Sequence, residues 1–280
     1  MNPEGTLLNR KGQSLFCKYW EPTERPRSLV FICHGYAEHC RIYEPLAQTL
    51  VSNNFFVFSH DHVGHGQSDG SRVQIDTFES FVDDVFKHID IIRKRFSDLD
   101  CFICGHSMGG AISILAALRK PEYFKGVVLI GPAIATNPEI ATPFKTTVAR
   151  MLRWIAPQFP IGGLDLNLIT SCPIQVETME KDPLRFHGFA KAGFGASLVE
   201  ACKDIQKKIP IMKFPFLICQ GEEDKICHPD GAVDMYENAA SEDKTIKMYP
   251  KKAYHSLLYE PNGIAETVTE DILAWIKERC

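Results

Sequence analysis

Residues 101–120, CFICGHSMGGAISILAALRK, join an apolar run typical of a buried strand to an Ala- and Leu-rich run typical of a helix. Between the two runs, GHSMG at 105–109 places one serine, Ser107, between two glycines. A G-x-S-x-G sequence also arises by chance in ordinary turns, so the flanking strand and helix give it its meaning. Between a strand and a helix this turn is sharp, and side chains at positions 105 and 109 would collide with neighbouring backbone, so glycine is needed at both. Ser107, at the centre of the turn, is therefore a candidate nucleophile.

Short apolar runs bounded by turn residues recur along the chain, at 28–33, 54–59, 101–104, 126–130, 214–219 and 245–249. Continuous rather than alternating apolar runs indicate strands that are buried on both faces, as in parallel sheets. Between them, 77–96 and 262–278 repeat apolar residues every three or four positions, which predicts helices with one buried face. The alternation predicts an α/β fold with a mostly parallel central sheet and helices on both faces.

Two segments depart from this alternation. Residues 14–20, SLFCKYW, are expected to form an edge strand that pairs antiparallel. The interval between the runs at 126–130 and 214–219 is far longer than a crossover helix requires, so residues 131–213 are interpreted as an insertion. The whole chain, 1–280, is expected to form a single domain that carries this insertion.

The composition excludes several classes of function. With 31 Lys and Arg against 35 Asp and Glu, and no block rich in basic residues, the chain lacks the positive patch that nucleic-acid binding needs. The first residues, MNPEGTLLNRKGQ, do not show the apolar stretch after a basic start that is typical of a signal peptide, and no apolar run is long enough to span a membrane, so a cytoplasmic location is expected. Several of the ten cysteines fall inside apolar runs, where they act as small hydrophobic residues. Cys101 and Cys104 form a C-x-x-C pattern, but it precedes the turn rather than starting a helix, which argues against a redox pair.

A serine hydroxyl is a weak nucleophile, so Ser107 needs a histidine base and an acid that orients the base. After the run at 214–219 comes Glu222-Glu223-Asp224, and Asp224 is the favoured acid because its shorter side chain holds an imidazole with less rotamer freedom. Glu223 is the substitute candidate. His255 follows the last apolar run, and the order Ser107, Asp224, His255 is that of the α/β-hydrolase fold.

The negative oxygen of a tetrahedral intermediate needs two hydrogen-bond donors. In this fold one is the amide after the nucleophile, here that of Met108, and the other lies in the loop after an earlier strand. The sequence VFICHGYAEH places Tyr36 in that loop, so its amide is the second expected donor. His34 is expected to hydrogen-bond the loop rather than to take part in catalysis.

The sequence contains two further histidine patterns. His60, His62 and His65 have the spacing of zinc hydrolases of the H-x-H-x-D-H type, but position 64 is glycine rather than aspartate, and no metal or cofactor is expected. His106 lies inside the G-x-S-x-G turn and is expected to line the pocket, since His255 already fits the position of the base.

Longer motifs then match a known family. HGYAEH, HDHVGHGQSDG, GHSMGGAISILAA, LICQGEEDKIC and AYHSLLYE, in this order, resemble the monoglyceride lipase family of serine hydrolases, which cleave monoacylglycerols to glycerol and fatty acid. The resemblance covers nearly the whole chain, including FCKYWEP near the start and NPE at 137–139. It implies an acyl-enzyme on Ser107, with Asp224 and His255 as its partners and the amides of Tyr36 and Met108 as oxyanion donors.

The resemblance also implies how substrate binds. It makes residues 131–213 a cap over an acyl tunnel and assigns substrate binding to Gly35, Glu38 and His106, the last two near the alcohol end. Cys227 corresponds to a cysteine that the family has near the site.

The chain departs from the family at the alcohol end. Tyr36 replaces a small residue, which keeps the backbone amide but adds a ring that can narrow the site. Three polar residues of the family appear as Ile42, Met179 and Leu258, with Arg41 as a nearby candidate to compensate. The hydrolytic chemistry is therefore expected to be intact, while recognition of glycerol is open.

Two other functions fit the same sequence. One is a carboxylesterase or lysophospholipase of broader specificity, which shares the triad but not the preference for glycerol. The other is a non-catalytic lipid-binding protein on the hydrolase scaffold, which is disfavoured because all three triad residues are present.

Residues 142–160, TPFKTTVARMLRWIAPQFP, predict an amphipathic helix within the insertion. Apolar residues recur at helical spacing beside three cations and a tryptophan: Phe144, Val148, Met151, Leu152 and Ile155, with Lys145, Arg150, Arg153 and Trp154. Such a helix lies on lipid surfaces or packs only on the protein core. The sequence predicts peripheral membrane contact through the cap.

Overall fold

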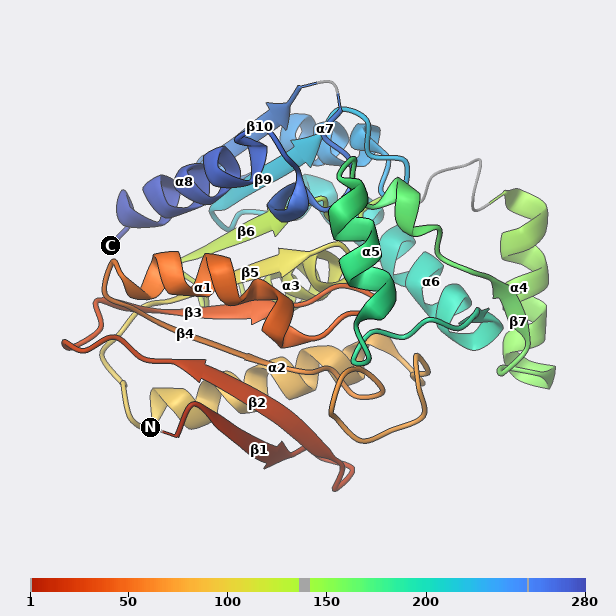
Figure 1. Cartoon of the computed structure of the whole chain (residues 1–280), viewed down its shortest axis with the longest axis horizontal. Helices are drawn as coiled ribbons and strands as arrows, with labels where there is room; N and C mark the ends of the chain where they lie inside the picture. Colours follow the sequence, from red (N-terminus) through yellow and green to blue (C-terminus); the bar gives the residue numbers. More distant parts are fainter. Residues whose placement is uncertain (1, 136–141, 251) are drawn as a thin grey trace.

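An eight-stranded sheet forms the centre of the computed structural model, which describes residues 2–135, 142–250 and 252–280 (Figure 1). Its strand order is β1-β2-β4-β3-β5-β6-β9-β10, and all neighbours from β4 to β10 pair in parallel. The strands are β1 (Glu4–Leu8), β2 (Ser14–Trp20), β3 (Ser28–Cys33), β4 (Phe55–His60), β5 (Cys101–His106), β6 (Gly126–Ile130), β9 (Phe216–Gly221) and β10 (Lys244–Tyr249). Every residue of β3, β4, β5, β6 and β9 is buried, which explains their continuous apolar sequences.

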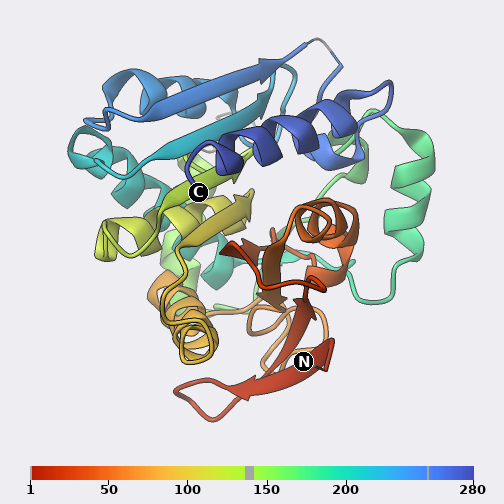
Figure 2. The ribbon, with the colours of Figure 1, turned by 90° about the vertical axis from the view of Figure 1, so that its left-hand side faces the viewer.

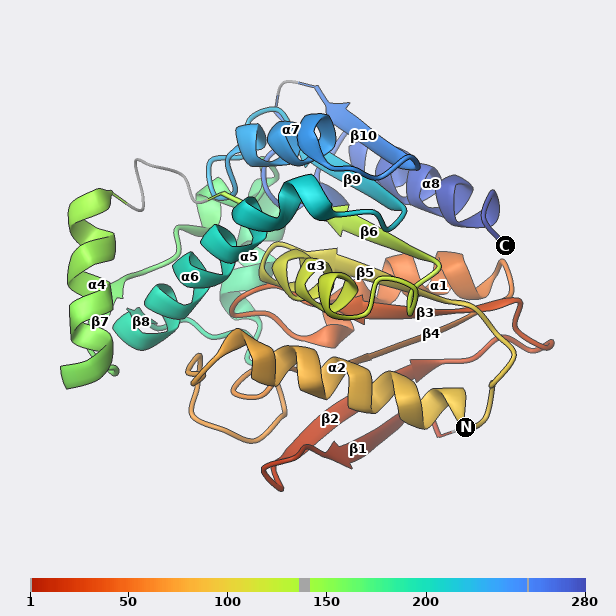
Figure 3. The same ribbon diagram turned by 180° about the vertical axis from the view of Figure 1, so that it is seen from behind.

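Helices cover both faces of the sheet. Helices α1 (Glu44–Val51) and α8 (Ile264–Lys277) lie on the face seen in Figure 1, whereas α2 (Phe78–Arg93), α3 (Met108–Arg119) and α7 (Pro229–Asn238) lie on the face seen in Figure 3. Successive side chains of each strand pack into two separate hydrophobic clusters, one on each face of the sheet. In β3, for example, Val30 and Ile32 belong to one cluster and Phe31 to the other. The predicted α/β-hydrolase fold, with a mostly parallel sheet covered on both faces, is confirmed.

The predicted edge strand at 14–20 is β2, and it pairs antiparallel with β4 as expected, but it does not lie at the edge. That position belongs to β1, which pairs antiparallel with β2 in a hairpin near the N-terminus (Figure 2). The Asn9 side chain accepts hydrogen bonds from the amides of Lys11 and Gln13 and so stabilises the hairpin turn. Because β1 buries only Leu7, its sequence carries almost no strand signal.

The segment between β6 and β9, called the insert here (residues 131–213), contains α4 (Pro143–Ile155), β7 (Pro160–Gly162), α5 (Pro173–Lys181), β8 (Ala190–Lys191) and α6 (Ala192–Lys208). Residues 136–141, which include the NPE sequence at 137–139, lie outside the described part. The helix predicted within 142–160 ends at Ile155, since Pro157 and Pro160 cannot continue it. It packs against α6 at one end of the molecule (Figures 1 and 3).

Candidate active site

Ser107 lies at the sharp turn between β5 and α3. Its φ of 54° is unusual for a residue other than glycine, and such strain persists only where the surroundings impose it. The Ser107 amide donates a hydrogen bond to the carbonyl of Ile130 in the neighbouring strand (3.0 Å), and its own carbonyl accepts from Gly110 and Ala111 in α3. Strand and helix therefore fix the serine from both sides.

The two glycines of the motif are required by close packing. A Cβ on Gly105 would lie 2.3 Å from the carbonyl oxygen of Gly109, and a Cβ on Gly109 would lie 2.1 Å from the carbonyl oxygen of Cys33. Both distances are shorter than any real contact of a Cβ, so the predicted collisions at 105 and 109 are confirmed. The contact at 109 also brings the start of α3 against the end of β3.

Asp224 and His255 follow β9 and β10 and meet at the same edge of the sheet. Nδ1 of His255 lies 2.8 Å from Oδ2 of Asp224, and both residues are buried. Gln220 donates a further hydrogen bond to Asp224 Oδ2 (3.1 Å), while the amides of Ile226 and Cys227 donate to Oδ1 (2.8 and 2.9 Å). These bonds hold the carboxylate in the orientation that His255 needs, and they favour Asp224 over Glu223 as the acid.

The protonation of His255 depends on this carboxylate. Burial alone would lower the pKa of His255, but the negative charge of Asp224 and its hydrogen bond outweigh burial, so the pKa lies above its ordinary value of 6.5. A histidine base works only when neutral. His255 should therefore lose its capacity to accept a proton already in mildly acidic solution.

Within the described part of the chain, Ser107 and His255 make no hydrogen bond to each other. Among the described residues, the side-chain contact of Ser107 Oγ is with Sγ of Cys227, at 4.0 Å. Such nucleophile–base bonds are often long in free enzymes and shorten when substrate binds. Cys227 thus lies beside the candidate nucleophile, where the family resemblance expects a cysteine.

The loop after β3 carries the expected oxyanion donor. Within the described ranges, the amides of Tyr36 and Met108 make no hydrogen bond to other residues, so both are free to donate to a ligand. His34 bonds to this loop as predicted: its Nδ1 donates to the carbonyl of Gly35 (2.8 Å), and its Nε2 accepts from the amide of His62 (2.9 Å).

Glu38 and His106 lie next to this loop. Oε2 of Glu38 accepts hydrogen bonds from the amide of Gly35 (2.9 Å), the Tyr43 hydroxyl (2.8 Å) and His106 Nδ1 (3.2 Å). Burial would raise the pKa of Glu38, but these donors and nearby positive charges hold it well below its usual value. The His106 ring lies 4.8 Å from that of His255, so it lines the site beside the candidate base.

His60, His62 and His65 are buried in the core. Nδ1 of His60 lies 3.2 Å from Nδ1 of His88 rather than facing a shared centre with the other two. Burial lowers the pKa of all three imidazoles, which keeps them neutral. In the part of the chain that the structure covers, no group of three or more His, Cys, Asp or Glu side chains is arranged to hold a metal ion.

The insert is bound to both loops of the site. The carbonyl of Ile169 accepts a hydrogen bond from the amide of Ser256, directly after His255 (2.7 Å). The amide of Phe186 donates to the carbonyl of Ala37 (3.1 Å), directly after Tyr36. The insert therefore contacts both the loop that carries Tyr36 and the loop that carries His255.

The departures from the family have clear positions. The Tyr36 ring packs against Phe194 of the insert, with centroids 4.9 Å apart. Ile42 and Leu258 pack against the hydrophobic cluster under α1 and α8, and Met179 is buried. The expectation that Arg41 compensates for their lost polarity is wrong, because Arg41 pairs with Glu4 at the surface (2.9 Å).

A different arginine reaches the site. Arg185 of the insert is buried, and its Nη2 lies 3.5 Å from Oε1 of Glu38. Sequence analysis missed this residue, because nothing in DPLRFHG at 182–188 distinguishes its arginine from a solvent-exposed one.

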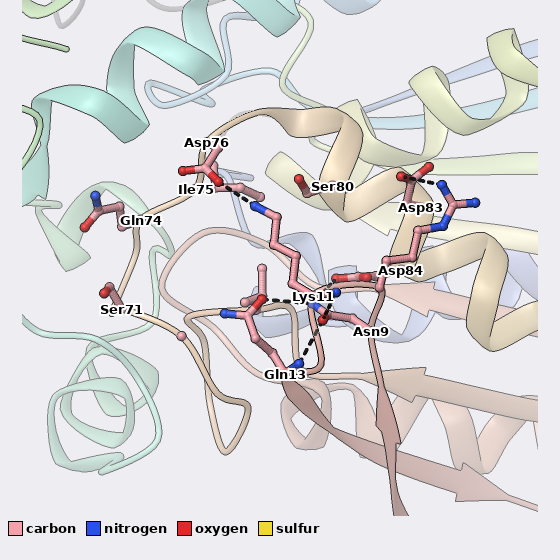
Figure 4. Close-up of a pocket in the computed structure, with 13 residues that line it drawn as sticks. Asn9, Lys11, Gln13, Ser71, Gln74, Ile75, Asp76, Ser80, Asp83 and Asp84 are labelled. Atoms are coloured by element: carbon pink, nitrogen blue, oxygen red, sulfur yellow. Dashed lines mark hydrogen bonds and ion pairs between the residues drawn. The ribbon is translucent and has the colours of Figure 1, made fainter. Parts of the chain in front are cut away.

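A hollow lies away from these residues, between the β1–β2 turn and the segment leading into α2 (Figure 4). It is lined by polar side chains that largely pair with one another, such as Lys11 with Asp76 (2.5 Å). None of Ser107, Asp224 and His255 lines it.

Comparison with known proteins identifies the family. A family model described as serine aminopeptidase S33 matches residues 24–262. The monoglyceride lipase of Mus musculus is 41% identical over 273 residues, which cover 98% of this chain and 90% of that protein. This chain belongs to the monoglyceride lipase family.

More distant members of the monoglyceride lipase family agree with this assignment. The monoacylglycerol lipase of Mycolicibacterium smegmatis is 32% identical over 92% of this chain and 90% of its own length. The crystal structure of Paleococcus ferrophilus monoacylglycerol lipase, 28% identical, matches with a TM-score of 0.85 over 95% of this chain and 99% of that one. The resemblance inferred from the sequence motifs is confirmed.

The choice of acid can be tested by comparing two neighbouring carboxylates. Asp224→Asn should lower kcat for a p-nitrophenyl ester about a thousand-fold or more, because a misoriented imidazole cannot act as a base. Glu223→Gln, the matched control, should change kcat by about twofold at most. The opposite ranking would identify Glu223 as the acid.

The pH dependence of kcat/KM tests the state of His255. Because the base must be neutral, kcat/KM should fall as pH decreases through the pKa of His255, with a midpoint above 6.5. Removing the negative charge in Asp224→Asn should move that midpoint to lower pH. A midpoint below 6.5 in the unmodified protein, or one that Asp224→Asn leaves in place, would contradict this account of the pair.

Proposed function

We propose that this protein is a serine hydrolase that cleaves monoacylglycerols to glycerol and a free fatty acid. The observation that carries the proposal is the buried Asp224–His255 pair, which lies beside the turn that holds Ser107 at positive φ, in a chain 41% identical to a monoglyceride lipase. Ser107 is the nucleophile, His255 the base, and Asp224 orients the imidazole and stabilises its protonated form.

The reaction proceeds through an acyl-enzyme. His255 takes the proton of Ser107 Oγ while the oxygen attacks the ester carbonyl, and the amides of Tyr36 and Met108 donate to the resulting oxyanion. The intermediate collapses, and protonated His255 gives its proton to the departing glycerol oxygen. Water then attacks the acyl-enzyme with His255 again as base, which releases the fatty acid and restores Ser107.

The insert acts as a cap over the site in this proposal. Its hydrogen bonds to the chain next to Tyr36 and next to His255 support that role, as does the packing of Phe194 on Tyr36. A cap that excludes water would protect the acyl-enzyme until the glycerol has left and strengthen the oxyanion contacts.

The replacement of three polar residues by Ile42, Met179 and Leu258 favours a second candidate, a carboxylesterase or lysophospholipase of broader specificity. The same triad would serve both functions, so only the preference for the alcohol separates them. The aminopeptidase activity in the description of the family model is a third outcome, and it requires cleavage of an amide bond.

A substrate panel with Ser107→Ala tests the proposal. The unmodified protein should hydrolyse a long-chain monoacylglycerol with higher kcat/KM than a lysophospholipid, a triacylglycerol or an aminoacyl anilide. Ser107→Ala should lower kcat by on the order of a million-fold while the thermal unfolding transition remains. A preference for lysophospholipid would support the broader esterase, and turnover retained by Ser107→Ala would exclude this serine as the nucleophile.

We further propose peripheral membrane contact through α4, in a protein that works in the cytoplasm. Met151, Trp154 and Ile155 are 62%, 81% and 81% exposed, and such side chains insert at the boundary between headgroups and acyl chains. The expected apolar face needs one correction: Val148 and Leu152 are half-buried against the protein, so they do not belong to the exposed surface. The side chains of Phe144 and Lys145 lie outside the described part.

The charges around α4 are modest. Arg150 is exposed, whereas Arg153 pairs with Glu200. Among the described helices none is long and apolar enough to cross a bilayer. Contact should therefore be reversible, somewhat stronger on anionic lipid, and weaker at high salt.

Vesicle binding tests this contact. Replacing Trp154 and Ile155 together by serine should reduce co-sedimentation with phosphatidylcholine–phosphatidylserine vesicles, because both side chains would otherwise bury apolar surface in the lipid. Hydrolysis of a soluble short-chain ester should stay near the parent rate. Ile174→Ser, which removes a similarly exposed residue on α5, is the control. Equal vesicle binding by all three proteins would make α4 a packing element only.

A further inference from the structure

Arg185 is a buried arginine with an unmet hydrogen-bonding capacity. It is 6% exposed, and its Nη2 has no hydrogen-bond partner among the described residues, although it forms an ion pair with Glu38 at 3.5 Å. A guanidinium N–H that is removed from water without an acceptor is costly. An arginine kept in this state is typical of a site whose acceptor comes from a ligand.

Glu38 offers the complementary atom. Its Oε2 is occupied by three donors from the scaffold, whereas the only contact of its Oε1 with the described residues is the long one with Arg185. Glu38 and Arg185 both line a cavity of about 310 Å³, together with His65, Pro183 and Phe186. A donor and an acceptor therefore stand side by side at the wall of a cavity large enough for a small polar group.

This pair lies next to the reacting centre. Glu38 contacts His106, which precedes Ser107 in sequence and whose ring is 4.8 Å from that of His255. The segment that carries Arg185 is joined to the oxyanion loop by the hydrogen bond from Phe186 to Ala37. None of Ser107, Asp224 and His255 lines the cavity itself, so the pair is connected to the reacting centre through His106 and the oxyanion loop.

We propose that Arg185 and Glu38 together recognise the hydroxyl groups of the glycerol that leaves, and that Arg185 determines the preference for this alcohol. The inference rests on the proposed function. A hydroxyl group both donates and accepts, so it can give its proton to Oε1 of Glu38 and accept from Nη2 of Arg185. Arg185 supplies polarity at the alcohol end where the chain has Ile42, Met179 and Leu258.

The charges at this position favour a neutral alcohol over an anionic one. A phosphate would meet the negative charge of Glu38 as well as the positive charge of Arg185. The second arginine of the cavity, Arg72, is exposed and donates to the carbonyl of Gly66 (2.9 Å). The cavity therefore presents one buried donor, Arg185, and two buried acceptors, Oε1 of Glu38 and Nε2 of His65, rather than a cluster of donors, which suits a polyol.

The test compares two esters of the same fatty acid, the 1-monoacylglycerol and the methyl ester, in the unmodified protein and three variants. The unmodified protein should prefer the monoacylglycerol. Arg185→Met should lower kcat/KM for the monoacylglycerol by about 10- to 100-fold, the range expected for a lost hydrogen bond to a charged group. Its kcat/KM for the methyl ester, which has no hydroxyl, should stay within about twofold of the parent. Arg41→Met, which removes a surface arginine, should leave both values unchanged.

Arg185→Lys guards against loss of folding in the methionine variant, since it keeps the charge next to Glu38 and should show an intermediate preference. Equal losses on both esters, or an unchanged ratio of the two, would overturn the inference while the protein remains a monoacylglycerol hydrolase. Faster cleavage of a monoacylglycerol phosphate than of the monoacylglycerol, abolished in Arg185→Met, would also overturn it and indicate an anion site. An unmodified protein that cleaves the methyl ester but not the monoacylglycerol would instead refute the proposed function.

Discussion

The first turn of α3 lies so close to the end of β3 that no side chain fits between them at position 109. This contact forces the chain from β5 into α3 through a sharp turn, which leaves Ser107 at positive φ. It also places the loop after β3, with the amide of Tyr36, next to the start of α3, with the amide of Met108. The nucleophile and both expected oxyanion donors therefore depend on one close approach of backbone to backbone.

The parallel sheet brings the other residues to the same place. The carboxyl ends of parallel strands meet at one edge, where loops from distant parts of the sequence converge. Asp224 and His255 follow β9 and β10 at this edge, and the insert follows β6. The insert then bonds to the loop that carries Tyr36 and to the loop that carries His255, so the same edge carries the candidate chemistry and the segment that is proposed to cover it.

Much of this could be predicted from the sequence, because buried parallel strands and the turn at Ser107 leave strong local patterns. The edge strand β1 could not, since a five-residue strand that buries only Leu7 has no apolar run. The choice between Asp224 and Glu223 depended on side-chain length alone, and the hydrogen bonds of Gln220, Ile226 and Cys227 to Asp224 were beyond sequence reasoning. Arg185 was missed because its burial against Glu38 is a contact between distant segments. Arg41, nearer in sequence, turns to Glu4 instead.

The central claim is that Ser107 forms a covalent intermediate with the help of His255. The most direct measurement is peptide mass spectrometry after brief exposure to an alkyl fluorophosphonate, which traps an activated serine. The account predicts one adduct, on the peptide that contains Ser107, and a large fall in its rate of formation in His255→Ala. An adduct on another serine, or equal rates of labelling with and without His255, would contradict it.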